Sequence, residues 1–87
     1  MYSREQISLV DMRMGQSGIV LGIAGGMGAA RRLESMGVRV GKRITKQSAM
    51  VMRGPITVRV GNTLVGLGYG IASKVMVDVS TSKEEDK

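Results

Sequence analysis

The chain has no cysteine and no histidine, and its 87 residues include one proline and two aromatic side chains, both tyrosine. Without cysteine it forms no disulfide and offers no thiolate to a metal ion. Without histidine it lacks the commonest metal ligand and the commonest general acid or base. Its few carboxylates show no spacing that implies a shared cleft. We therefore expect a binding protein and not an enzyme.

The chain also lacks a long apolar run. No stretch approaches the roughly 20 residues that are needed to cross a bilayer. The start of the chain shows no basic, apolar and small-residue pattern of a signal peptide, so we expect a cytoplasmic protein. A chain of this length has room for one hydrophobic core. We expect one domain over residues 1–79 and a disordered tail over residues 80–87, where every side chain is polar or charged.

Glycine, in contrast, is abundant, with 13 residues, about twice the usual share of about 7 %. These glycines separate short runs of β-branched and aliphatic residues, which is typical of turns between strands. Strands are expected at residues 19–23, 42–48, 56–60, 63–67 and 75–79. Together with one short helix, they predict an all-β fold, a small and partly open barrel of five strands.

The clearest strand signal is a hairpin near the end of the chain. Ile56, Val58 and Val60 alternate with polar residues and should point inward. The dipeptide Gly61-Asn62 is typical of a two-residue hairpin turn, and it should join this strand to residues 63–67.

The two earlier strands carry weaker patterns. Ile19, Leu21 and Ile23 alternate with smaller residues and predict the buried face of the first strand. In residues 42–48, Ile44 is the only large aliphatic side chain. This thin apolar content, together with lysine, predicts an edge strand, where lysine also hinders association between sheets.

One helix interrupts the strands, at about residues 27–36. Its apolar residues recur every three positions and should line its buried face: Met27, Ala30, Leu33 and Met36. Gly37 follows, where a left-handed cap commonly ends a helix. Because so short a helix is not stable alone in water, it must be held by packing against the strands.

Positive charge is concentrated in the middle of the chain. The whole chain has 13 Lys and Arg against 7 Asp and Glu, a net charge of +6. Between residues 31 and 59 the only acidic residue is Glu34, and the cations are Arg31, Arg32, Arg39, Lys42, Arg43, Lys46, Arg53 and Arg59. Such a cluster attracts an acidic surface over a long range.

We predict that the protein docks a macromolecular partner through part of this segment. Arginines would speed the encounter, and exposed methionines would bury apolar surface against the partner. The candidate binding residues are Arg31, Arg32, Arg39, Met50, Met52 and Arg53.

Two other readings stay open at this point. A small basic β-barrel is also typical of nucleic-acid binding, although Tyr69 is the only aromatic side chain away from the first residues of the chain. Met50 and Met52 form a Met-x-Met pair whose thioethers suit a soft ion such as Cu(I). Exposed strand edges would also let two copies of the chain pair.

From Leu9 to Val79 the sequence resembles the FeoA family of ferrous-iron uptake proteins, and the C-terminal FeoA-like domain of DtxR-type repressors. The arginine-leucine pair, followed by Met-Gly and by a second glycine four residues later, is the most specific part of the resemblance. Three blocks carry it: Gly15-Gln16-Ser17-Gly18-Ile19-Val20, Arg32-Leu33-Glu34-Ser35-Met36-Gly37-Val38-Arg39-Val40-Gly41 and Gly54-Pro55-Ile56-Thr57-Val58-Arg59-Val60.

The resemblance implies an SH3-like barrel and an accessory or regulatory role. By this analogy the partner is FeoB, the membrane iron transporter with a cytosolic GTPase domain, and neither a small-molecule substrate nor a nucleic acid is expected. The family resemblance also implies transition-metal binding. In this chain only carboxylates and thioethers could serve as side-chain ligands of the usual metal-binding kinds.

Overall fold

The computed structural model describes residues 6–49 and 54–79. Three of the predicted partner-binding residues, Met50, Met52 and Arg53, and the predicted tail over residues 80–87 lie outside this part of the chain. Within residues 6–49 and 54–79, no helix has the length and apolar character needed to span a membrane.

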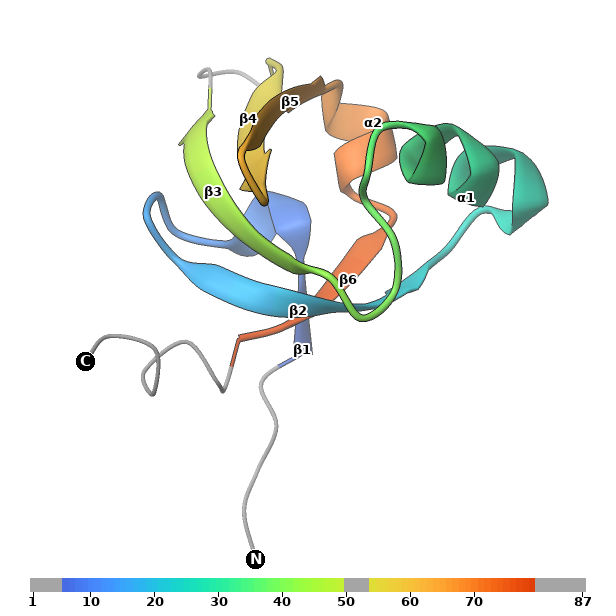
Figure 1. Cartoon of the computed structure of the whole chain (residues 1–87), viewed down its shortest axis with the longest axis horizontal. Coiled ribbons are helices and arrows are strands. Elements are labelled where there is room, and N and C mark those ends of the chain that lie inside the picture. The colour runs from blue at the N-terminus through green and yellow to red at the C-terminus, as the bar shows by residue number, and fades with distance from the viewer. Residues whose placement is uncertain (1–5, 50–53, 80–87) are drawn as a thin grey trace, which may run out of the picture.

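The chain folds into one strongly curved antiparallel sheet with two short helices beside it (Figure 1). In the described residues the sheet has six strands, in the order β1-β6-β2-β3-β4-β5. The strands are β1 (Gln6–Ser8), β2 (Ser17–Ile23), β3 (Arg43–Ala49), β4 (Ile56–Val60), β5 (Thr63–Leu67) and β6 (Val75–Asp78). The helices are α1 (Gly26–Ser35) and α2 (Tyr69–Ala72), and a 3₁₀ turn spans Leu9–Asp11.

The predicted all-β, partly open barrel is confirmed, with one strand more than expected. The extra strand, β1, has only three residues and pairs with β6 at the far end of the chain, from Gln6 opposite Asp78 to Ser8 opposite Met76. A strand of three residues is too short to show a hydrophobic alternation, so no local pattern reveals it.

The prediction that residues 42–48 form an edge strand is wrong. Strand β3 lies inside the sheet, between β2 and β4. The outer strands in the described residues are β1 and β5. Lysine misleads here because Lys46, in the middle of the strand, is buried and only 4 % exposed.

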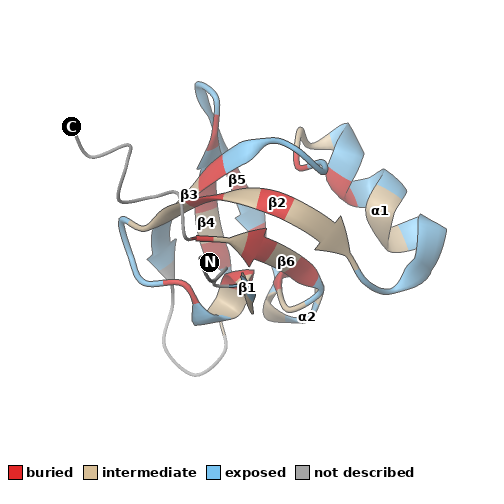
Figure 2. Ribbon diagram, turned by 90° about the horizontal axis from the view of Figure 1, so that it is seen from below, coloured by how far each residue is buried: buried red, intermediate tan, exposed pale blue. Residues whose placement is uncertain are grey.

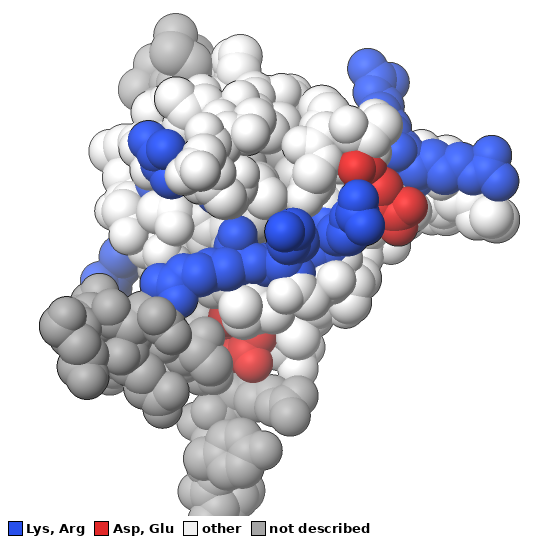
Figure 3. Space-filling model, in the orientation of Figure 1, with Lys and Arg blue, Asp and Glu red and all other residues white. Residues whose placement is uncertain are grey.

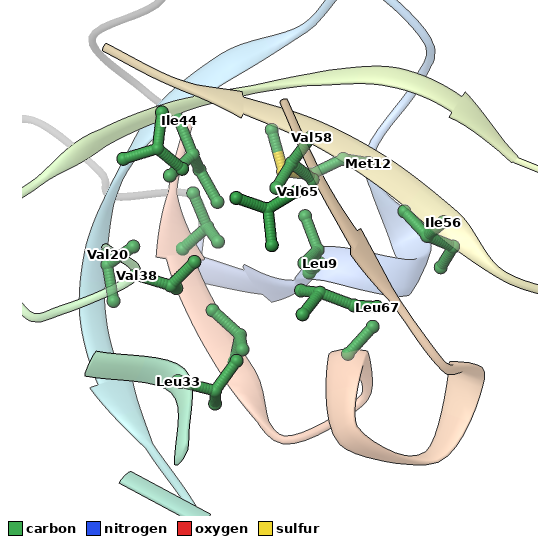
Figure 4. Close-up of a cluster of buried hydrophobic side chains, with 14 of the residues drawn as sticks. Leu9, Met12, Val20, Leu33, Val38, Ile44, Ile56, Val58, Val65 and Leu67 are labelled. Atoms are coloured by element: carbon green, nitrogen blue, oxygen red, sulfur yellow. The ribbon is translucent and has the colours of Figure 1, made fainter. Parts of the chain in front are cut away.

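The core lies inside the curve of the sheet, where aliphatic side chains from all parts of the fold meet (Figures 2 and 4). Ile56, Val58 and Val60 of β4 point into it, as predicted. The turn at Gly61-Asn62 joins β4 to β5 with Val60 opposite Thr63, so the predicted hairpin is confirmed. After β5 the chain forms the four-residue helix α2, which has one buried side chain, Ala72.

The predicted buried face of β2 is wrong at Ile19 and Leu21, whereas Ile23, which follows a register shift between Val20 and Gly22, does pack against the core. Val20 is 1 % exposed and Gly18 is buried, whereas Ile19, Leu21 and Ile23 are only partly buried. Because glycine has no side chain, a hydrophobic pattern gives no sign that a glycine faces inward. At Gly18 this absence is required, because an added Cβ would lie 2.4 Å from Val77 Cγ1 and 2.7 Å from the carbonyl oxygen of Asp78.

We expect Gly18→Ala to lower the free energy of unfolding by about 1–3 kcal/mol, because β6 must move to admit the methyl group. The matched control is Gly22→Ala on the same strand, where an added Cβ meets nothing within 4 Å. Urea unfolding of both variants compares the two costs. Equal stability of the two variants would contradict the close approach of β2 and β6 at Gly18.

Helix α1 is held by one buried side chain. Leu33 is fully buried, and it points from the helix into the core (Figure 4). Ala30 and Met36 are partly buried, but Met27 is 69 % exposed, so its predicted place on the buried face is wrong. The first turn of the helix projects beyond the sheet (Figure 1). Gly37 follows the helix with a φ of 95°, the predicted left-handed cap.

Candidate functional site: the basic face

Most cations of the described residues are exposed. Figure 3 shows a band of Lys and Arg side chains across one face of the molecule, with further cations beside it. Arg31 and Arg32 are exposed on α1, and Arg39 is exposed in the loop between α1 and β3. The structure therefore places these three predicted residues on the surface, Arg31 and Arg32 on one helix and Arg39 in the loop that follows it. Only small acidic areas lie beside the band in this view.

The sheet supplies a second set of cations through its register. Ile44 is buried, so its neighbours Arg43 and Thr45 face outward from β3. Arg59 on β4 lies directly opposite Thr45. Arg43 and Arg59 are therefore diagonal neighbours on the outer face, a relation that puts Cα atoms about 7–8 Å apart.

These side chains line an open hollow of about 320 Å³ at the end of the β4–β5 hairpin. Its lining residues are Lys42, Arg43, Thr45, Arg59 and Gly61. Three of them are cations and none is acidic. Sequence reasoning counted Lys42, Arg43 and Arg59 in the basic segment but did not select them as site residues. The signal that could have found them is strand alternation. Arg43 and Arg59 each stand next to a buried residue of the same strand, so their side chains point to the outer face.

Lys46 is the cation of β3 that does not face the solvent. Its Nζ donates hydrogen bonds to the carbonyl oxygens of Val10, at 3.0 Å, and Met12, at 2.7 Å. Burial lowers the pKa of its amine below the ordinary value of 10.5, and the carboxylate of Asp11 opposes this shift. Lys46 is therefore a structural residue, which fixes the loop before β2, and not part of the basic surface.

The described residues do not fit the transition-metal site that the resemblance implies. The chain has no histidine or cysteine. Within residues 6–49 and 54–79, no three acidic residues come together. The potential ligands of the soft-metal reading, Met50 and Met52, fall outside these ranges.

What the described surface offers is positive charge on a rigid sheet and a short helix. Arginine guanidinium groups bind carboxylate and phosphate oxygens in a bidentate manner, and lysine adds a point charge. The arrangement can therefore bind anions or attract an acidic macromolecule.

Solved structures with the same fold fall into two groups. The crystal structure of an iron uptake regulatory protein, FeoA, is 38 % identical, with a TM-score of 0.77, and the match covers 84 % of this chain and 95 % of that one. The FeoA of Stenotrophomonas maltophilia, crystallised with zinc and described as a prokaryotic SH3-domain protein, is 25 % identical with a TM-score of 0.71, over 87 % and 93 % of the two chains. A manganese-dependent transcriptional repressor shares the fold at 22 % identity and a TM-score of 0.80, over 91 % of this chain and 44 % of the repressor.

Sequence comparison agrees with the structural one. A protein of Methanocaldococcus jannaschii, described as an Fe(2+) transport protein A, is 33 % identical over 70 residues, which are 80 % of this chain and 83 % of that protein. The FeoA domain matches residues 7–79. The predicted resemblance and the SH3-like fold are thus confirmed, and the chain belongs to the FeoA domain family.

Proposed function

We propose that the protein is a small, non-enzymatic accessory of ferrous iron uptake, and that it acts by binding the cytosolic part of a FeoB-type transporter. Membership of the FeoA family supports the role in iron uptake. The observation that carries the docking mechanism is the exposure of Arg31 and Arg32 on α1 and of Arg39 in the loop that follows it. In this proposal the protein works in the cytoplasm, at the inner face of the membrane through its partner.

The chemistry of these residues favours electrostatic steering. Complementary charge raises association rates and fixes orientation more than it raises affinity. Exposed apolar side chains near the arginines would then add buried area, and Met27, on the same helix, is 69 % exposed. Met50, Met52 and Arg53 remain proposed contacts outside the described residues.

We expect the double variant Arg31→Glu/Arg32→Glu to associate about tenfold or more slowly with the purified cytosolic domain of FeoB at low salt. Its association rate should also depend less steeply on NaCl concentration, because fewer attractive charges remain to be screened. Biolayer interferometry over a salt series measures both quantities.

A matched comparison uses single charge reversals. Arg31→Glu should slow association more than Arg13→Glu, which makes the same charge change at an exposed arginine in the loop before β2. Equal effects of the two single variants would show that net charge alone matters, and would contradict docking through α1. A tighter, salt-dependent mobility shift with short RNA or DNA would instead favour the nucleic-acid reading.

A further inference from the structure

We propose that two copies of the chain pair through the outer edge of β5, as antiparallel strands around a two-fold axis at Val65. In the described residues β5 is the last strand of the sheet, so its far edge has no neighbouring strand there (Figure 1). The pairing uses no residue of the docking surface on α1. It also does not depend on the identity of the transporter partner.

The register of the β4–β5 hairpin determines which backbone groups face this edge. Val60 lies opposite Thr63 across the two-residue turn, and the residues that flank such a turn are commonly joined by a hydrogen bond. Along an antiparallel pair, bonded and non-bonded residues alternate. Leu64 and Gly66 therefore direct their N–H and C=O groups away from β4. In the part of the chain that the structure describes, neither residue makes a backbone hydrogen bond outside the strand ladders.

β5 lacks the features that usually prevent an edge strand from pairing. Such edges are commonly protected by charged residues, by proline, by a bulge or by being very short. The sequence of β5, Thr-Leu-Val-Gly-Leu, contains no charge and no proline, and its pairing with β4 shows no register shift. The outer strand at the other side, β1, has only three residues. Of the two outer strands in the described sheet, β5 is therefore the one that can accept another strand.

A two-fold axis at Val65 gives the pairing a defined register. Leu64 of one copy then lies opposite Gly66 of the other, and the same pair occurs again on the other side of the axis. Both members of each pair have backbone groups that face the edge, so each pair can exchange two hydrogen bonds. An axis at Leu64 or at Gly66 would leave only one such pair within β5. The axis at Val65 therefore satisfies more of the free backbone groups.

The side chains on the outer face fit this register. Leu64 is 55 % exposed, and Gly66 is exposed on the same face of the strand. A glycine inside a strand weakens it, and often marks a bulge, a bend or the close approach of another chain. At Gly66 there is no bulge and no positive φ, and an added Cβ would meet no described atom within 4 Å. The fold of one copy therefore does not require this glycine, and Leu64 of a second copy would cover it.

The edge of β5 is also a place where two copies of a basic protein can meet with little repulsion. Each copy has a net charge of +6, but β5 carries no charge. The cation of the neighbouring strand is Arg59, opposite Leu64. Three strand spacings place the β4 strands of the two copies about 14 Å apart, which exceeds the Debye length of about 8 Å at physiological ionic strength. Added salt should therefore strengthen this association, whereas it should weaken docking to an acidic partner.

The paired edge is short, so the dimer should be weak, as is typical of interfaces that bury less than about 1,200 Å². The test is therefore amide hydrogen exchange of the ¹⁵N-labelled full chain over a dilution series from about 0.02 to about 2 mM. The amides of Leu64 and Gly66 should gain protection as the concentration rises, and should gain more at high salt. The amides of Thr63 and Val65, which face β4, should be protected at every concentration. Unchanged exchange of Leu64 and Gly66 over the whole series would overturn the proposal.

Cross-linking tests the register, because the natural chain has no cysteine. Leu64→Cys and Gly66→Cys are prepared as separate proteins, mixed in equal amounts and oxidised. Opposite residues of a bonded pair have Cα atoms about 5.5 Å apart, within the range of a disulfide. Two copies of the same variant place their thiols on diagonal positions, about 7–8 Å apart, which is outside that range.

The mixed disulfide should therefore exceed the proportion that random encounters give. Met27→Cys is the matched control, because it places an accessible thiol on α1, where the native side chain is 69 % exposed. Its mixture with Leu64→Cys should show no such preference. Random proportions in the mixture of Leu64→Cys and Gly66→Cys would contradict the register.

A charge on the edge should prevent the pairing. Leu64→Lys should weaken self-association about tenfold or more, because a lysine on an edge strand hinders the approach of another strand. Met27→Lys makes the same change of charge at an exposed side chain of α1 and should have a much smaller effect. Sedimentation equilibrium of the two variants compares them. Equal effects would show that net charge controls association, and would contradict pairing through β5.

A strand from another protein is the rival occupant of this edge. Protection of Leu64 and Gly66 that appears only after addition of the cytosolic domain of FeoB would assign the edge to that protein, and would overturn the self-pairing. The Arg31→Glu/Arg32→Glu variant should still self-associate. The pairing of two copies and the docking through α1 can therefore fail separately.

Discussion

Replacing Leu33 by alanine should lower the free energy of unfolding by about 2–5 kcal/mol, the range that is typical of truncating a buried leucine. The physical reason lies in the construction of α1. This helix has ten residues, and Leu33 is its only buried side chain. A helix of this length is not stable in water without tertiary packing. Urea unfolding followed by circular dichroism measures the loss.

Leu33→Ala should loosen α1 more than it loosens the rest of the fold. Amide hydrogen exchange in α1 should accelerate more than exchange in β4 and β5, which form their own hairpin. Met27→Ala, a truncation on the exposed side of the same helix, should change stability by less than about 0.5 kcal/mol. If Leu33→Ala and Met27→Ala had the same cost, the helix would not be anchored as the structure describes.

We also expect Lys46→Met to be strongly destabilising, by about 2 kcal/mol. The Lys46 side chain donates hydrogen bonds to the carbonyl oxygens of Val10 and Met12, and a hydrogen bond to a charged group contributes about 1.5–3 kcal/mol. The favourable removal of a buried charge offsets part of this loss. Lys42→Met is the matched control, because Lys42 is exposed beside the start of β3. Thermal unfolding of the two variants compares their costs.

The contribution of Lys46 to the free energy of unfolding should depend on pH in the alkaline range. Its pKa is lower in the folded chain than its ordinary value of 10.5. At a pH between the folded and the ordinary pKa, the unfolded chain therefore binds more protons than the folded chain. Stability from this group therefore rises with pH through that window. The advantage of the native protein over Lys46→Met should grow as the pH approaches 10.5. A constant or shrinking advantage would contradict a lowered pKa.

The parts of the fold that local patterns determine could be predicted from the sequence. The hairpin at Gly61-Asn62 follows from a turn dipeptide between two alternating runs. The inward residues Ile56 and Val58 follow from alternation alone. The helix and its cap at Gly37 follow from a change of period and a glycine.

Three of the errors involve partners that are distant in the sequence. The strand β1 exists only because β6 pairs with it, about 70 residues later. Gly18 faces inward because β6 approaches too closely for any side chain. Lys46 is buried because backbone carbonyls of residues 10 and 12 satisfy its amine. None of these contacts leaves a periodic signal in the sequence.

The candidate site was predictable in its charge but not in its shape. The basic segment and the arginines of α1 are evident from composition, and the structure places Arg31, Arg32 and Arg39 on the surface. The hollow depends on the register between β3 and β4, where Thr45 meets Arg59. A register between strands that are not joined by a tight turn cannot be read from either strand alone.

The basic face has unequal mechanical support along its length. At one end, Arg43 and Arg59 are attached to strands that are hydrogen-bonded to neighbours on both sides. Arg31 and Arg32, in contrast, lie on a helix with only one fully buried side chain, Leu33. The arginines of the sheet therefore stand on the better-supported part of the fold, and we expect the backbone beneath them to open less often than the backbone of α1.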